Sequence, residues 1–187
     1  MILLETERAK LEDLHREPGK AELIGGRIVR FMATGWRPGE IARNILLLIV
    51  AFVKSAGRGT VFGDNVGYAV PQLPSGRESF SPDISYYDGP RPDDEMDFVH
   101  GPPTFAVELR SKDGYGPAAE KAMAAKRADY FSAGTKVVWD VDIKAECVNV
   151  YTHLSPATKK TFLRGQIADA EPALPGWRVP VDKVFEK

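Results

Sequence analysis

The sequence predicts an α/β fold in which a mixed central β-sheet is flanked by helices. A long apolar helix pattern runs from Pro38 to about Ser55 and is followed by several short strand patterns. The run Thr104–Leu109 is nearly all apolar around one glutamate, which is typical of a central strand covered on both faces. A helix pattern and a further strand, Lys136–Val141, come next, and the order strand, helix, strand indicates a parallel crossover unit.

Length and composition favour one domain over residues 1–187. The chain has 187 residues, of which 43% are apolar and 27% are charged, and its formal net charge is −1. This balance is ordinary for a soluble globular domain. A strongly basic nucleic-acid binder would carry an excess of lysine and arginine, so the near balance weakens that interpretation. A local basic patch remains compatible with it.

The single cysteine and the N-terminal segment bear on the cellular setting. Cys147 has no partner for an intrachain disulfide, so a reducing, cytoplasmic setting fits best. The N-terminal MILLETERAK becomes charged within a few residues, unlike a secretory signal peptide. The most apolar run, Ile45–Val53, is far shorter than the ~20 residues that a membrane span needs. We therefore expect a cytoplasmic protein that does not cross a membrane.

The first part of the chain predicts a helical extension followed by a hairpin. Residues 1–20 make up the extension, with a short surface helix at about Glu5–Arg16 that Pro18-Gly19 ends. Gly25-Gly26 lies between two short strand patterns and predicts a hairpin turn.

The long helix that opens at Pro38 is predicted to be buried. Its apolar residues extend almost all round the helix, which is typical of a helix enclosed by other elements. Gly57 and Gly59 end it. The main stripe consists of Ile41, Ile45, Ile49 and Phe52, and it is widened by Leu46, Leu47, Val50 and Val53.

Short strands connect this helix to the central strand. Strand patterns occur at Thr60–Phe62, Val66–Val70 and Asp83–Tyr87. The stretch Asp88–Pro103 holds four prolines and several acids, which predicts an exposed, irregular loop.

The second half of the chain predicts a helix and then peripheral strands. Pro117 suits the first turn of a helix that runs to about Ala133, with Gly134 as its stop. Beyond the strand at Lys136–Val141, the run Val148–Tyr151 and a turn at Gly176-Trp177 indicate further strands at the periphery.

Two acids mark the candidate site. Glu108 lies inside the central strand, where a charge is costly to bury unless something offsets it. Asp83 stands at the start of another strand. Two neighbouring acids repel each other, and a divalent cation resolves that repulsion. The pattern therefore indicates a site for a hard divalent cation and a polarised water, as used to cut a phosphodiester.

A lysine joins these acids from the following helix. One stripe of that helix should face the sheet, and it places Lys126 on the inward side, where an unpaired ammonium would be expensive. Glu108 is the simplest partner, because a short connection joins its strand to the helix. Lys121 and Arg127 lie off the stripe and are expected to be ordinary solvated charges. The stripe is formed by Ala119, Met123, Lys126 and Tyr130.

From these residues alone, two interpretations stay open. Lys126 and Glu108 could be a structural ion pair, with Asp83 only capping a turn after Pro82. Glu22, just before the Gly25-Gly26 turn, could be an exposed acid at a strand edge or a fourth member of the site.

Six stretches of the chain resemble a known family, the Uma2 restriction endonucleases of the PD-(D/E)XK nuclease superfamily. Each motif is moderately specific, and their order and spacing together are strongly specific. The resemblance runs from about Ala21 to Phe185. The stretches are AELIGGRIV at 21–29, SPDISYY at 81–87, FAVELRS at 105–111, KRADYFSAG at 126–134, VVWDVD at 137–142 and LPGWRV at 174–179.

The resemblance implies a restriction-endonuclease-like core that binds Mg²⁺ or Mn²⁺ and hydrolyses nucleic-acid phosphodiesters, with DNA as the expected partner. It makes Asp83 and Glu108 the metal ligands and catalytic acids, and it matches Glu22 to an early catalytic glutamate. Many superfamily members carry a lysine two residues after the second acid, where this chain has Arg110. The resemblance implies that the catalytic lysine is Lys126 instead. A homodimer is compatible with this interpretation.

The chain also departs from the family pattern. Ser111-Lys112 replaces a frequent Ser-Pro, Gly39-Glu40 replaces a frequent histidine, and Asp140 replaces a residue that is usually apolar. None of these removes a proposed ligand. We expect Arg110 and Lys112 to contact the substrate, and Arg27, Arg37 and Arg43 are further candidates. Two rival hypotheses remain: a nucleic-acid-binding module without turnover, and an interaction domain whose charges only hold the sheet to its helix.

Overall fold

A six-stranded mixed sheet forms the centre of the fold. The computed structural model describes residues 8–187. The strand order is β11-β10-β9-β8-β6-β3, and only β8 and β9 are parallel, so the predicted strand–helix–strand crossover is confirmed. The strands are β3 (Thr60–Phe62), β6 (Ile84–Tyr87), β8 (Phe105–Leu109), β9 (Val137–Asp142), β10 (Cys147–Thr152) and β11 (Ser155–Phe162).

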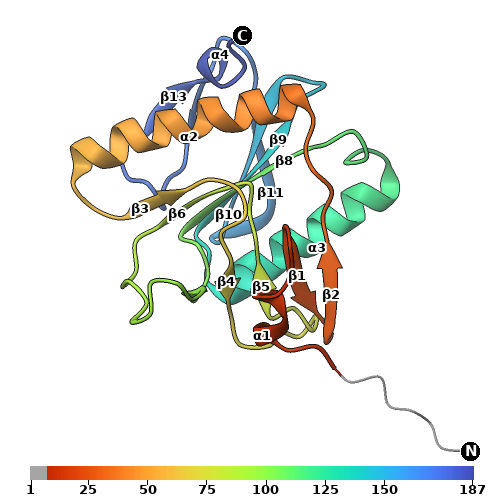
Figure 1. Cartoon of the computed structure of the whole chain (residues 1–187). Coiled ribbons are helices and arrows are strands. Elements are labelled where there is room, and N and C mark those ends of the chain that lie inside the picture. The colour runs from red at the N-terminus through yellow and green to blue at the C-terminus, as the bar shows by residue number, and fades with distance from the viewer. Residues whose placement is uncertain (1–7) are drawn as a thin grey trace, which may run out of the picture.

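Two long helices, α2 (Trp36–Ala56) and α3 (Pro117–Ala133), lie on opposite sides of this sheet (Figure 1). Both end at a glycine in the left-handed region, Gly57 with φ 70° and Gly134 with φ 114°. Each helix therefore stops where the sequence predicts.

Helix α2 is buried along one face only, so the prediction of an enclosed helix is wrong. Its buried residues follow a single stripe, while Leu47 on the outer side is 59% exposed. Helix α2 covers the sheet with one face, and its opposite face is exposed. Its outer apolar residues therefore made the helix pattern look like that of an enclosed helix. The buried stripe consists of Ile41, Ile45, Ile49 and Val53.

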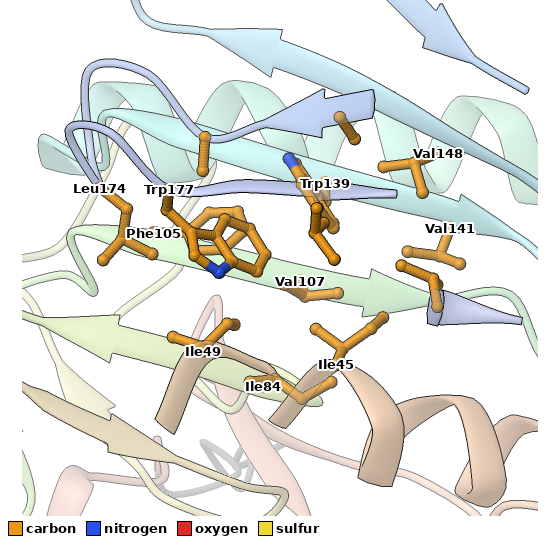
Figure 2. Close-up of a cluster of buried hydrophobic side chains, with 14 of the residues drawn as sticks. Ile45, Ile49, Ile84, Phe105, Val107, Trp139, Val141, Val148, Leu174 and Trp177 are labelled. Atoms are coloured by element: carbon orange, nitrogen blue, oxygen red, sulfur yellow. The ribbon is translucent and has the colours of Figure 1, made fainter. Parts of the chain in front are cut away.

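The larger hydrophobic core lies between α2 and the sheet (Figure 2). Ile45 and Ile49 of α2 meet Ile84 and Val107 of the central strands. The C-terminal segment closes this side, with the ring centroid of Trp177 5.0 Å from that of Trp139. That segment comprises β12 (Ile167–Asp169), β13 (Arg178–Pro180) and α4 (Val181–Val184).

A smaller core lies on the other face, beneath α3. Tyr130 of α3 stacks on Phe80, with ring centroids 4.2 Å apart. A three-stranded sheet in the order β5-β4-β7 contributes to this core. Strand β7 falls inside Asp88–Pro103, so that stretch is not wholly irregular as predicted, and the strand predicted at Val66–Val70 is two residues long. The strands are β4 (Tyr68–Ala69), β5 (Ser79–Phe80) and β7 (Val99–His100).

The N-terminal hairpin is present, and its turn lies at Gly25-Gly26 as predicted. Strand β1 (Ala21–Ile24) pairs with β2 (Arg27–Arg30). The helix predicted at Glu5–Arg16 begins outside the described residues, and its described part is a single turn, α1 (Leu11–Leu14). Across residues 8–187, none of the helices combines the length and the apolar character required to traverse a membrane.

Candidate active site

Three acids form a row across neighbouring strands of the central sheet. Glu108 of β8 and Asp140 of β9 are register partners, and Asp83 directly precedes Ile84, which pairs with the residue before Glu108. The backbone N–H of Leu109 donates to Asp83 Oδ2 at 2.7 Å. Because side chains alternate along a strand, Glu108 and Asp140 point to the α3 face. Asp83, expected at a strand start, lies directly before β6, and Glu108 lies on the adjacent strand β8.

Lys126 of α3 points inward and lies between two glutamates. Its Nζ is 2.9 Å from Glu108 Oε1 and 3.0 Å from Glu22 Oε1, and its side chain is 11% exposed. The hydroxyl of Tyr130, one helical turn further on, donates to Glu108 Oε1 at 2.6 Å. The ring of Phe31 covers the amine at 5.4 Å. The predicted pair of Lys126 with Glu108 is therefore present.

Glu22 belongs to the same cluster and is not an exposed strand-edge acid. Its side chain is completely buried. Its Oε1 accepts the backbone N–H of Ser81 at 3.0 Å, and its Oε2 accepts a hydrogen bond from Arg77. Arg77 is held in turn by Asp129 at 2.8 Å. Glu22 is thus fully buried and paired with two cations, so it is suited to hold Lys126 rather than to ligate a metal.

The charges in this cluster shift one another's pKa. Burial alone would lower the pKa of Lys126, but Glu108 and Glu22 outweigh it and raise that pKa above its usual value. Burial would raise the pKa of Glu22, but Lys126 and Arg77 hold it below its usual range. For Glu108, burial dominates, and with the repulsion from Asp83 it raises the pKa despite Lys126. Lys126 therefore stays charged at neutral pH.

A second lysine, Lys20, completes the site and was missed by the sequence analysis. Its Nζ donates to Asp83 Oδ1 at 2.5 Å and lies 2.8 Å from Asp64 Oδ1. Burial would lower the pKa of Lys20, but Asp83 and Glu108 raise it well above the usual value. Lys20 directly precedes β1, so the N-terminal hairpin carries both it and Glu22 to the site.

The third acid of the row, Asp140, forms a separate network. Arg110 grips it through two hydrogen bonds, of 2.7 and 2.8 Å, and also binds Glu120. Arg127 donates to Asp140 Oδ2 at 3.0 Å and is buried, so the expectation that it is a solvated charge is wrong. The guanidinium of Arg110 is thus engaged by two carboxylates, whereas Lys112 is exposed in the turn after β8.

A divalent cation fits the donors that Asp83 and Glu108 offer. Within residues 8–187, no three His, Cys, Asp or Glu side chains gather closely enough to form a complete protein cage. Mg²⁺ does not require one, because it is commonly bound by one or two carboxylates with waters and substrate phosphates. The hydrogen bonds of Glu108 converge on Oε1, and none from residues 8–187 reaches Oε2.

The charge count agrees with that fit. Four carboxylates face three cations in this cluster, even when Asp64 is left out, so the cluster can accept added positive charge. The carboxylates are those of Glu22, Asp83, Glu108 and Asp129, and the cations are Lys20, Arg77 and Lys126.

The fold resembles that of a solved structure. It is titled "Crystal structure of a putative nuclease belonging to DUF820 from Anabaena variabilis", and it superposes with a TM-score of 0.73 at 18% identity. The superposition covers 94% of this chain and 96% of that one. At this identity the likeness shows the fold.

Comparison with protein families identifies the family as well as the fold. A comparison with curated proteins gives no match. The model of the family described as "Uma2: Putative restriction endonuclease" matches residues 8–182, which is nearly the whole chain. The resemblance seen in the sequence motifs is confirmed, and the chain belongs to the Uma2 family.

Proposed function

We propose that this protein is a metal-dependent endonuclease that hydrolyses phosphodiester bonds of DNA, with Mg²⁺ or Mn²⁺ as its cofactor. One observation carries the proposal. Asp83, directly before β6, lies beside the adjacent strand β8 that carries Glu108, and the Lys126 amine is 2.9 Å from Glu108. Membership of a family described as restriction endonucleases supports the same reaction class.

Asp83 and Glu108 are the residues that would hold the cation. When bound, such a cation polarises the phosphate and lowers the pKa of an attacking water. Tyr130 fixes the orientation of Glu108 through its hydrogen bond to Oε1, and the Leu109 N–H fixes Asp83 through Oδ2. These contacts orient both carboxylates. Oε2 of Glu108 accepts no donor from residues 8–187, whereas Oδ1 of Asp83 accepts a hydrogen bond from Lys20.

Lys126 would serve as a charged hydrogen-bond donor. Glu108 and Glu22 raise its pKa and favour the charged amine, which suits a donor better than a general base. A positioned ammonium can instead orient the water or stabilise negative charge that develops on the phosphate. Glu22 is a positioning residue in this scheme, since it holds the amine at 3.0 Å while binding Arg77 and the Ser81 N–H.

Substrate contacts have to come from local cations, because the net charge is −1. Lys112 is exposed directly after the strand that carries Glu108, and Arg27 and Arg43 are also exposed. Arg110 would have to leave Asp140 or Glu120 before it could clamp a phosphate. We therefore propose Lys112 as the better placed of the two predicted substrate contacts.

The test is cleavage of supercoiled plasmid DNA with Mg²⁺ or Mn²⁺ by the wild type, Glu108→Gln and Asp83→Asn. Asp93→Asn is the matched control, since Asp93 is an exposed acid in the loop that follows β6. We expect nicking by the wild type and the control and none by the two site variants. Binding of DNA by the wild type without cleavage would instead support a module without turnover. If the wild type neither binds nor cleaves DNA, the result would favour an interaction domain.

A further inference from the structure

We propose that the ammonium of Lys20 is a built-in placeholder for the divalent cation. It rests on Asp83 when no metal is bound, and it passes to Asp64 when a cation takes its place. The inference rests on the proposed function, because it needs Asp83 to be a metal ligand. It goes further by assigning roles to Lys20 and Asp64.

The contacts of Lys20 place positive charge directly on the proposed metal ligand. Its Nζ lies 2.5 Å from Asp83 Oδ1, and the other oxygen of Asp83 is taken by the Leu109 N–H. Oδ1 is therefore the atom of Asp83 that remains for a cation, and the amine occupies it. An ammonium and a divalent cation on the same oxygen would repel each other, so the two compete for that position.

Asp64 offers the amine a second resting place. It lies just beyond β3, and its Oδ1 is 2.8 Å from Lys20 Nζ. The side chain of Asp64 is 53% exposed, whereas that of Lys20 is 14% exposed. The Asn65 N–H donates to Asp64 Oδ1 at 2.9 Å and holds the carboxylate in place. Because a lysine amine moves on a flexible stem, it can keep Asp64 while releasing Asp83.

A purely structural role for Lys20 predicts something different. In that case the amine only ties the N-terminal hairpin to the central sheet, and its removal lowers stability without tightening metal binding. If Lys20 is a placeholder, its removal frees Asp83 Oδ1 and the apparent affinity for the cation rises. Removal of the Asp64 charge should instead lower the affinity for the cation, since without Asp64 the amine has only Asp83 to bind.

The test is titration calorimetry of Mn²⁺ into four proteins: the wild type, Lys20→Met, Asp64→Asn and the double variant. We expect Lys20→Met to bind Mn²⁺ about tenfold more tightly, a typical size for coupling between competing sites. Asp64→Asn should bind several-fold more weakly. In the Lys20→Met background the same change should have little effect, because Asp64 then has no amine to hold.

Two controls match the charge changes at exposed positions. Lys121→Met removes a lysine from the outer side of α3, and Asp93→Asn removes an acid from the loop after β6. Both should bind Mn²⁺ as the wild type does. Circular dichroism checks that each variant is folded. If Lys20→Met does not fold, Lys20→Gln keeps most of the side chain and still removes the charge.

The outcomes separate this inference from the proposed function. If the wild type binds no Mn²⁺, the proposed function itself fails. If the wild type binds Mn²⁺ but removal of the Lys20 charge leaves the affinity unchanged or lower, the placeholder is refuted and the metal site stands. If Asp64→Asn weakens binding equally with and without Lys20, Asp64 acts through its own charge and the transfer of the amine is refuted.

Discussion

Lys126 and Arg127 are neighbours on one helix, yet they serve two buried charge networks of different kinds. Lys126 joins Glu108 of β8, whereas Arg127 joins its register partner Asp140 of β9. The site network comprises Lys20, Glu22, Arg77, Asp83, Glu108, Lys126 and Asp129. The Asp140 network comprises Arg110, Glu120, Arg127 and Asp140. Buried charge in this molecule therefore occurs in two separate networks, one at the candidate site and one around Asp140.

The two networks differ in charge balance. The Asp140 network has two acids and two arginines, and both oxygens of Asp140 accept hydrogen bonds. Arg127 also lies over the ring of Tyr151, 4.0 Å from its centroid. The site network has more carboxylates than cations, and Glu108 keeps one oxygen free of donors from residues 8–187. The Asp140 network therefore leaves neither oxygen of Asp140 free, whereas the site network can take up added positive charge.

The largest expected effect is on stability in the Asp140 network. Asp140→Ala leaves two arginines buried without their shared partner, and breaking a buried pair in this way costs about 4 kcal/mol. Urea unfolding followed by circular dichroism measures the loss. Asp93→Ala is the control, because Asp93 is an exposed acid in the loop that follows β6. Equal losses for the two variants would contradict the structural role of the Asp140 network.

The next effect is on catalysis in the site network. Lys126→Met should remain folded and still bind metal, but cleave DNA at least about a hundredfold more slowly, the scale of losing one positioned donor. Arg127→Met removes the neighbouring cation and should lower stability while the folded fraction keeps its rate. Single-turnover cleavage of plasmid measures both variants. A folded Lys126→Met protein that cuts at the wild-type rate would contradict the role of Lys126 and turn attention to Lys112.

Glu22→Gln should show a smaller loss that depends on pH. Lys126 and Arg77 hold the pKa of Glu22 below its usual range, so the ionised carboxylate stabilises the fold above its unfolded-state pKa. That stabilisation is lost as the pH falls through the lower, folded-state pKa. We expect a loss of about 2 kcal/mol at pH 7, the scale of hydrogen bonds to charged groups. Thermal unfolding of both proteins from pH 7 downward measures this loss. If the stability difference between the wild type and Glu22→Gln does not shrink in acid, the ionised Glu22 is not the source of the stabilisation.

The smallest expected effect is the salt dependence of DNA binding. The net charge is −1 and the Asp140 network occupies two arginines, so few cations are free for phosphates. Each contact contributes a log–log slope of about −0.9. Fluorescence anisotropy across a salt series should give a shallow slope. A slope that requires ten or more neutralised phosphates would contradict this view of the surface.

Patterns within single elements were predictable, and contacts between distant segments were not. The stripe on α3 correctly predicted that Lys126 faces Glu108, because a short connection joins the helix to the strand. The same stripe could not show that Arg127 is buried, since its partner Asp140 comes from the next strand. Strand β11 was missed because all but its last residue, Phe162, are exposed, so it carries no apolar pattern.

The contributions of the N-terminal hairpin were the hardest to predict. Glu22 was assigned a site role only by family resemblance, because its partners Arg77 and Lys126 lie more than fifty positions away. Lys20 was missed altogether, since Asp64 and Asp83 lie more than forty positions away and no local pattern marks the residue before a strand. Long-range ion pairs of this kind require the fold to be known.

We propose that the row formed by Asp83, Glu108 and Asp140 holds a cation site at one end and a structural charge at the other. Calorimetric titration of Mn²⁺ into the wild type, Asp83→Asn and Asp140→Asn tests it most directly, because the two variants make the same change in the same row. We predict that the wild type and folded Asp140→Asn bind Mn²⁺ with similar affinity, and that Asp83→Asn loses most of the binding. Equal binding by Asp83→Asn and the wild type, or loss of binding only in Asp140→Asn, would contradict the account.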